Sequence, residues 1–189
     1  MGRILLGIIL CLVLLPLAVL AWFQFGHPPV AVADAPFPFE RQIVSIPLNA
    51  RIGREMPGNA PLQADEATLT AGAQVFGDQC AVCHGFLGKP SNLGSSMYPE
   101  APQLWVQHKG SSVVGVSNDP PGETYWKVLN GIRLTGMPGF RSTLTETEIW
   151  QVTLLLANAD EPLPPAALQI VHGELPPEAA PAPSAPAAH

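Results

Sequence analysis

The chain of 189 residues is long enough for one or two domains, and its 22 prolines cluster before residue 62 and after residue 161. Proline-rich runs without periodicity do not build a core, so we expect a folded part of about 100 residues. The net charge is −6 and the sequence shows no basic patch, which excludes nucleic acid as an expected partner.

An apolar run from Ile4 to Phe23 follows Arg3, the one charged side chain at this end. Roughly 20 such residues suffice to span the hydrocarbon core of a bilayer, so residues 1–25 are predicted to form a transmembrane anchor. The positive-inside rule then predicts a single-pass protein of the cell inner membrane, with the rest of the chain on the periplasmic side. The alternative is a cleaved signal peptide, because Ala31-Val32-Ala33 is typical of a cleavage site. The apolar run is longer than the usual h-region, which favours the anchor.

Residues 26–64 are predicted to form a proline-rich stalk that holds one short helix. Apolar side chains between Phe39 and Met56 fall near helical spacing. Pro47 interrupts this pattern, so we expect a bent or broken helix.

Residues 65–160 are predicted to be the folded domain. Its first helix can be capped by Asp65 or Thr70, carries an apolar face, and is expected to stop at Gly77. Residues 85–121 are rich in Gly, Ser, Asn and Pro, which indicates a long loop.

Two more helices follow in this domain. A short one is predicted over Thr124–Leu129, ended by Gly131, and the clearest one runs from Thr145 to Asn158 behind a capping box of Thr145 and Glu148. The sequence shows no persistent strand pattern, and residues 161–189 are mostly proline and alanine. The prediction is therefore an all-α domain of a few short helices with long loops, followed by a disordered C-terminal tail over residues 161–189.

The run Cys80-Ala81-Val82-Cys83-His84 is a C-x-x-C-H motif, the attachment signature of haem c. Two thiols at this spacing can reach the two vinyl groups on one edge of a porphyrin, and the adjacent histidine can then ligate the iron. The cofactor predicted is one covalently bound haem c. Zinc would need two more ligands at suitable spacing, and a thioredoxin-like motif would need a βαβ context. A disulfide between Cys80 and Cys83 would leave His84 unexplained.

The second axial ligand of the iron has three candidates, Met97, His108 and Met137. Met97 follows His84 too closely for the chain to pass round the haem edge easily, and His108 lies in a polar loop typical of solvent exposure. Met137 lies between a glycine and a proline, which shape a loop that presents its side chain. Met137 is therefore the predicted ligand.

Residues 65–160 resemble the class I monohaem cytochromes c, in a membrane-anchored form of the bacterial type. The resemblance rests on Gly72 and Phe76 in the first helix, the C-x-x-C-H-G run at 80–85, Pro102-Gln103-Leu104, the segment from Gly131 to Phe140, and Trp150 in the last helix.

The resemblance implies a particular packing of the domain. Its first and last helices would cross where Gly72 allows close approach, and Phe76 would meet Trp150. A backbone carbonyl near Pro90 or Pro102 would accept a hydrogen bond from the ring of the iron-ligating histidine.

A haem held by histidine and methionine has no open coordination position, and methionine raises the reduction potential relative to a second histidine. The expected function is single-electron transfer between periplasmic or membrane redox partners, and the chain itself is not expected to be an enzyme. One alternative is an electron-transfer subunit of a periplasmic dehydrogenase or oxidase. The other is a haem-based ligand sensor in which Met137 dissociates.

Overall fold

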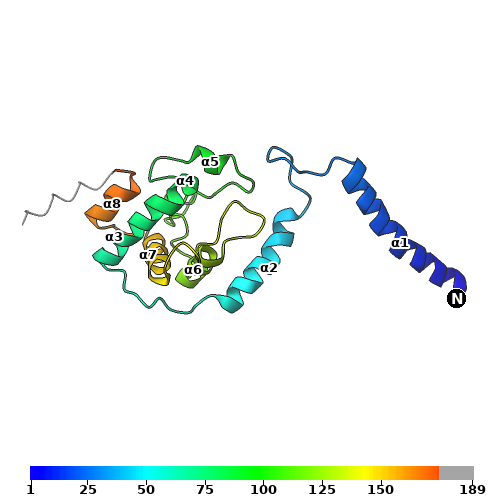
Figure 1. The fold of residues 1–189 in the computed structure, drawn as a ribbon, viewed down its shortest axis with the longest axis horizontal. Coiled ribbons are helices and arrows are strands. Elements are labelled where there is room, and N and C mark those ends of the chain that lie inside the picture. The colour runs from blue at the N-terminus through cyan, green and yellow to red at the C-terminus, as the bar shows by residue number, and fades with distance from the viewer. Residues whose placement is uncertain (175–189) are drawn as a thin grey trace, which may run out of the picture. The chain divides into compact units, whose positions relative to one another are not determined.

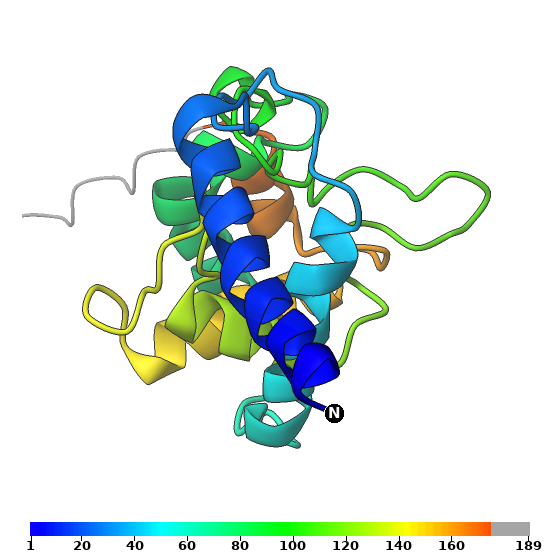
Figure 2. The ribbon, with the colours of Figure 1, turned by 90° about the vertical axis from the view of Figure 1, so that its right-hand side faces the viewer.

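The computed structural model describes residues 1–174 and divides into two compact units, residues 1–44 and the chain from Ser45 onward. Every regular element in the described part is a helix, as Figure 1 and Figure 2 show. The longest irregular segments are the loops that follow α5 and α6, residues 96–120 and 131–145. Isolated bridges pair Phe86 with Lys89 and Gln107 with Val114. The predicted all-α class with long loops is confirmed.

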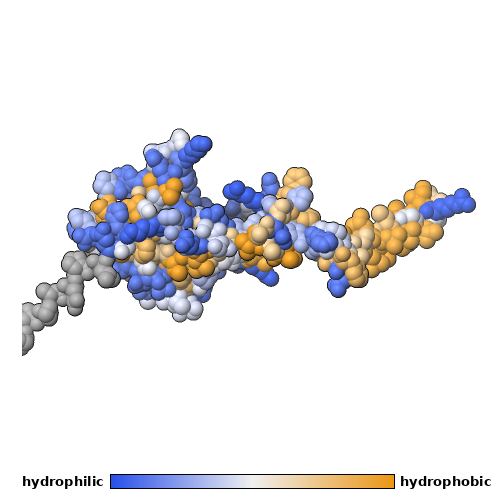
Figure 3. Space-filling model, turned by 90° about the horizontal axis from the view of Figure 1, so that it is seen from above, coloured by the Kyte–Doolittle hydropathy of each residue, from blue (hydrophilic) through white to orange (hydrophobic). Residues whose placement is uncertain are grey.

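The first unit contains α1, Gly2–Phe25, whose side chains are all exposed. Its mean hydropathy reaches 3.1 over an 18-residue window, and its surface is almost continuously apolar in Figure 3. By length and composition, α1 is a helix that can cross a membrane. A signal sequence near an N-terminus has the same properties.

The helix α2, Glu40–Glu55, runs through Pro47 without a break. The expected break at Pro47 is therefore wrong, because contacts beyond the proline hold the helix in place. Ile52 is buried, the indole N–H of Trp126 donates to the Glu55 carboxylate at 2.9 Å, and the Arg51 guanidinium lies 5.9 Å from the centre of the Trp126 ring. The stalk from residue 45 onward thus packs with the domain.

The helix α3, Glu66–Val75, begins where Asp65 accepts a hydrogen bond from the Thr68 N–H at 2.8 Å. The expected stop at Gly77 is wrong. The chain continues through a π-helical turn, η1 (Phe76–Cys80), into α4 (Ala81–His84), and only Gly85, with φ of +73°, ends it. Burial of Phe76 on one side of Gly77 and of Ala81 on the other keeps the chain helical against the preference of glycine.

The π turn changes which side chains face the core. The Ala81 N–H donates to the Phe76 carbonyl, five residues earlier rather than four. In a regular α-helix Cys80 would follow Phe76 on the buried face, because residues four apart share a face. With the extra residue Ala81 takes that place at 4% exposure, and Cys80 is left half-buried.

The helix α7, Glu146–Ala157, crosses α3. Its capping box of Thr145 and Glu148 is present as predicted. A Cβ on Gly72 would meet the carbonyl oxygen of Gln151 and lie 3.1 Å from the Cβ of Leu155. The close approach expected at Gly72 is therefore confirmed.

The aromatic core beside this crossing contains both Phe76 and Trp150. The Phe76 ring meets Trp105 edge to face at 5.2 Å, and the Trp150 ring stacks on Tyr125 at 4.2 Å. A direct contact between Phe76 and Trp150 stays a prediction.

Two further helices lie between α4 and α7. The single turn α5 covers Asn92–Ser95, within the segment predicted as loop. The helix α6, Pro121–Asn130, contains the predicted helix Thr124–Leu129 and ends at Gly131 with φ of +68°, as expected. Figure 2 shows the loop between α5 and α6 projecting from the helices.

The helix α8, Pro165–Val171, corrects the expectation that disorder begins at residue 161. Pro165 occupies the first turn, where a missing N–H costs nothing. Val171 is fully buried and its carbonyl accepts from the Leu87 N–H at 2.8 Å, while the Lys89 ammonium donates to the His172 carbonyl at 2.7 Å. The remainder of the predicted tail, residues 175–189, lies outside the described residues.

The helix crossing gives a testable prediction on stability. Gly72→Ala should lower the free energy of unfolding by about 1–3 kcal/mol, since the added methyl group has no room against the Gln151 carbonyl. Gly53→Ala, in α2 with no atom within 4 Å of the new Cβ, should raise that free energy by about 0.5–1 kcal/mol. Denaturant unfolding of the haem-loaded full chain measures both, and equal effects of the two substitutions would contradict the packing described.

Candidate functional site

The predicted attachment residues Cys80 and Cys83 lie at the end of η1 and within α4. All three cysteines of residues 1–174 are free thiols. Burial raises the pKa of the Cys80 thiol to about 12, and the neighbouring Cys83 acts in the same direction. A redox-active thiol needs a lowered pKa, so both the helical position and the neutral thiol disfavour the thioredoxin-like alternative.

The imidazole of His84 ends α4 and is held by one hydrogen bond. Its Nδ1 lies 2.8 Å from the carbonyl oxygen of Pro102. A carbonyl can only accept, so Nδ1 carries the proton and Nε2 keeps a free lone pair, as a metal-ligating histidine requires. Burial lowers the pKa of His84, although the Pro102 hydrogen bond works against it, and the neutral form is favoured. Of the two carbonyls that the sequence left open, the structure selects that of Pro102.

The loop after His84 closes tightly on the motif. A Cβ on Gly94 would meet the carbonyl oxygen of Cys83, and a Cβ on Gly85 would lie 2.6 Å from the Lys89 carbonyl oxygen. The Ser91 hydroxyl donates to the Val82 carbonyl at 2.6 Å. The backbone that carries the two thiols and the histidine is thus fixed by the segment 85–94.

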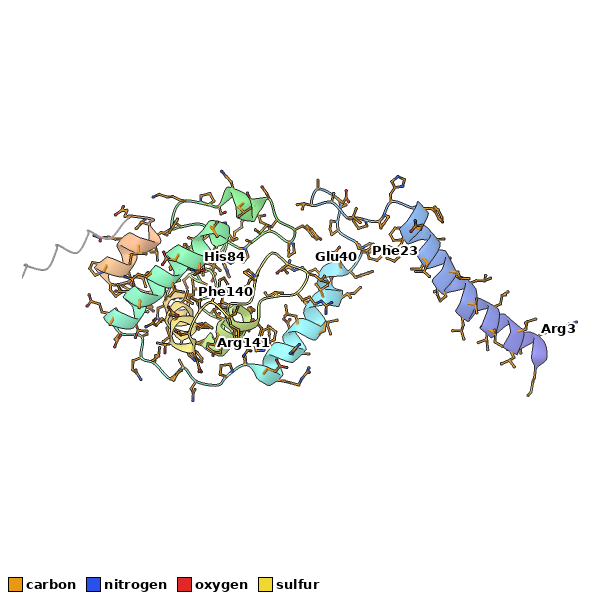
Figure 4. All side chains as sticks on the ribbon, in the orientation of Figure 1. Arg3, Phe23, Glu40, His84, Phe140 and Arg141 are labelled. Carbon is orange, nitrogen blue, oxygen red and sulfur yellow. The ribbon has the colours of Figure 1, made fainter. Side chains whose placement is uncertain are left out.

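The predicted ligand Met137 lies in the loop between α6 and α7, which Figure 4 shows with Phe140 and Arg141 labelled. Its side chain is half-buried and packs against the same hydrophobic core as Cys80. The Ile132 N–H donates to the Met137 carbonyl at 3.2 Å, and the Met137 N–H donates to the Thr135 hydroxyl at 3.1 Å. The loop therefore presents a methionine whose main chain is held on both sides.

The two other candidate ligands lie in different surroundings. His108 is exposed, in the projecting loop. Met97 is half-buried, and its sulfur would lie 2.8 Å from a Cβ on Gly136, so its side chain packs on the loop that carries Met137. The short sequence separation between His84 and Met97 did not predict this contact.

Sequence reasoning also missed Trp105, whose side chain is buried beside Phe76. Within the described residues its indole N–H is buried and has no hydrogen-bond partner. A buried donor without a partner costs about 1–3 kcal/mol, so this one points to an acceptor on a group held here. A haem carries two carboxylates that can accept from such a donor, and Trp105 belongs to the same hydrophobic core as Cys80 and Met137. The motif adds the thiol of Cys83 and the free Nε2 of His84. The residues therefore fit haem c.

Residues 1–174 hold no cluster of three or more His, Cys, Asp or Glu side chains suited to a bare metal ion such as zinc.

Helices, thiols and histidine together define a c-type cytochrome domain. Residues 67–155 match the family model described as cytochrome c oxidase, cbb3-type, subunit III. This part of the chain is therefore a monohaem c-type cytochrome domain, which binds haem c covalently and serves electron transfer.

Two more distant likenesses extend beyond this segment. A thiosulfate dehydrogenase of Stutzerimonas stutzeri (strain A1501) is 24% identical over an alignment of 155 residues, and the match covers 78% of this chain and 48% of the relative. The chain thus spans about half the length of that relative. A chain of the reducing HAO-like protein complex of Kuenenia stuttgartiensis is similar with a TM-score of 0.43 and 19% identity, over 74% of this chain and 54% of that one.

Proposed function

We propose that Cys80 and Cys83 bind haem c through thioether bonds, that His84 and Met137 are the axial ligands of its iron, and that the chain is a membrane-anchored carrier of single electrons. The observation that carries the proposal is the hydrogen bond from His84 Nδ1 to the Pro102 carbonyl, which leaves Nε2 free for a metal. The partners proposed are redox proteins of the periplasm or the membrane, and α1 is the proposed anchor in the inner membrane.

Haem c, when bound, supplies a one-electron couple between ferric and ferrous iron. The residues of the chain set the conditions for it. The Pro102 carbonyl fixes the ring of His84, the buried side chains around Phe76 and Trp105 exclude water, and the thioether of Met137 is a soft ligand that favours the ferrous state and raises the potential. With His84 and Met137 both bound, the iron would have no position left for oxygen or peroxide, which would favour a carrier rather than a sensor.

A second candidate function is an electron-transfer subunit of a periplasmic dehydrogenase or oxidase, favoured by the alignment of 155 residues with a thiosulfate dehydrogenase. Membranes that contain such a partner should show reduction of the haem when thiosulfate is added, and the purified chain should not. Co-purification of a dehydrogenase from solubilised membranes would favour the subunit. Thiosulfate oxidation by the purified chain alone would instead make the chain an enzyme.

The proposed attachment is tested by haem-stained denaturing electrophoresis. The wild-type polypeptide should keep its haem, while Cys80→Ala or Cys83→Ala should weaken or abolish the stain, because each removes one thioether bond. Cys11→Ala, in α1, is the matched control and should keep the full stain. Release of haem from the denatured wild type into acidified organic solvent would refute covalent attachment through these residues.

The proposed ligation by Met137 is tested by spectroscopy and potentiometry. The oxidised protein should show the weak near-infrared sulfur-to-iron band. Met137→His should lose that band and lower the potential while the haem stays low-spin, and Met137→Ala should open a site for carbon monoxide, because the imidazole replaces the thioether and alanine supplies no ligand. Met97→Leu and His108→Ala should keep the band, because neither substitution removes the proposed ligand. A wild-type spectrum and potential in Met137→Ala would transfer the role to Met97 or His108.

The proposed anchor is tested by fractionation. The mature protein should stay in the membrane fraction after an alkaline carbonate wash and keep an intact N-terminus, because α1 buries about 20 apolar residues in the bilayer. A soluble product that begins at Asp34 would show cleavage after Ala33 and a signal peptide instead of an anchor.

A further inference from the structure

The turn that precedes Met137 is closed by one threonine hydroxyl. The Thr135 hydroxyl donates to the Ile132 carbonyl at 2.7 Å and accepts from the Met137 N–H at 3.1 Å. One hydroxyl can do both, since it has one donor and two lone pairs. The Ile132 N–H in turn donates to the Met137 carbonyl at 3.2 Å, so both peptide groups beside the Met137 Cα are tied to the segment 132–135.

The two ends of the loop that carries Met137 are held by backbone contacts. Gly131 has φ of +68°, and a Cβ there would lie 2.9 Å from the Met137 carbonyl oxygen and 2.6 Å from the Gly139 nitrogen. The Phe140 N–H donates to the Val128 carbonyl in α6 at 3.0 Å. These contacts are made by the backbone, whereas the bond to the Met137 N–H is made by a side chain and can be removed by substitution.

We propose that Thr135 is a positioning residue whose hydroxyl fixes the main chain of Met137 and so directs its thioether toward the iron. The inference rests on the proposed ligation by Met137. Fixing the two peptide groups fixes the direction of the Cα–Cβ bond and leaves only the side-chain torsions free. Without the hydroxyl the Met137 N–H turns to water, and conformations with the sulfur away from the iron gain population.

The test uses imidazole as a competitor for the position of Met137 in the oxidised, haem-loaded full chain. Thr135→Val keeps the shape and the β-branch but removes the hydroxyl and both of its hydrogen bonds. It should bind imidazole about three- to tenfold more tightly, as the loss of the bond to the Met137 N–H predicts. Its near-infrared band should weaken and its potential should fall, because methionine ligation favours the reduced state.

Two variants separate the hydroxyl from general effects of substitution. Thr135→Ser keeps the hydroxyl and should restore wild-type imidazole affinity and potential. Thr143→Val is the matched control, because the Thr143 hydroxyl also donates to a carbonyl three residues earlier, that of Phe140 at 3.3 Å, in the adjacent exposed turn. It should behave as wild type.

Wild-type imidazole affinity and potential in Thr135→Val would overturn the proposal, and so would a Thr135→Ser variant as altered as Thr135→Val. If Thr135→Val does not accumulate with haem, Thr135→Ala is judged by the same two criteria. Met137→Ala distinguishes a failure of the proposed ligation by Met137 from a failure of the proposed role of Thr135. Wild-type imidazole affinity in that variant would refute ligation by Met137, whereas tight binding there with wild-type behaviour of Thr135→Val would refute only the role of Thr135.

Discussion

The backbone contact between α3 and α7 at Gly72 is the constraint on which the rest of the domain depends. No side chain separates the two helices there, because a Cβ on Gly72 would meet the Gln151 carbonyl. Because the two helices approach so closely, their crossing fixes the position of α3. The chain then continues from α3 without a helix break to His84. The position of the motif is thus set by packing that lies more than two helical turns away from it.

The π turn then determines which side chains of the motif face the core. A regular helix would have turned Cys80 toward the core behind Phe76, and one extra residue gives this place to Ala81. The His84 ring then meets the Pro102 carbonyl across the loop, which settles which ring nitrogen carries the proton.

The sequence predicted those elements whose signals are local. The capping box of Thr145 and Glu148 and the stop at Gly131 depend on a few adjacent residues, and both are present. The parts missed depend on distant contacts: Ile170 and Val171 bury α8 in a segment whose prolines indicated disorder, and Trp126 holds the helix that Pro47 was expected to break. The choice of Pro102 over Pro90, and the buried N–H of Trp105, likewise have no local signature.

The crossing at Gly72 also closes a loop of the chain that contains all the residues of the site. The entropic cost of such a loop grows only with the logarithm of its length, and each doubling adds only about 0.6 kcal/mol. Residues 106–112 lie exposed inside it, in the segment that projects from the helices. Insertions there would barely change the cost of bringing α3 and α7 together, so the outer surface of the domain is free to change in size while the helices that carry His84 keep their place.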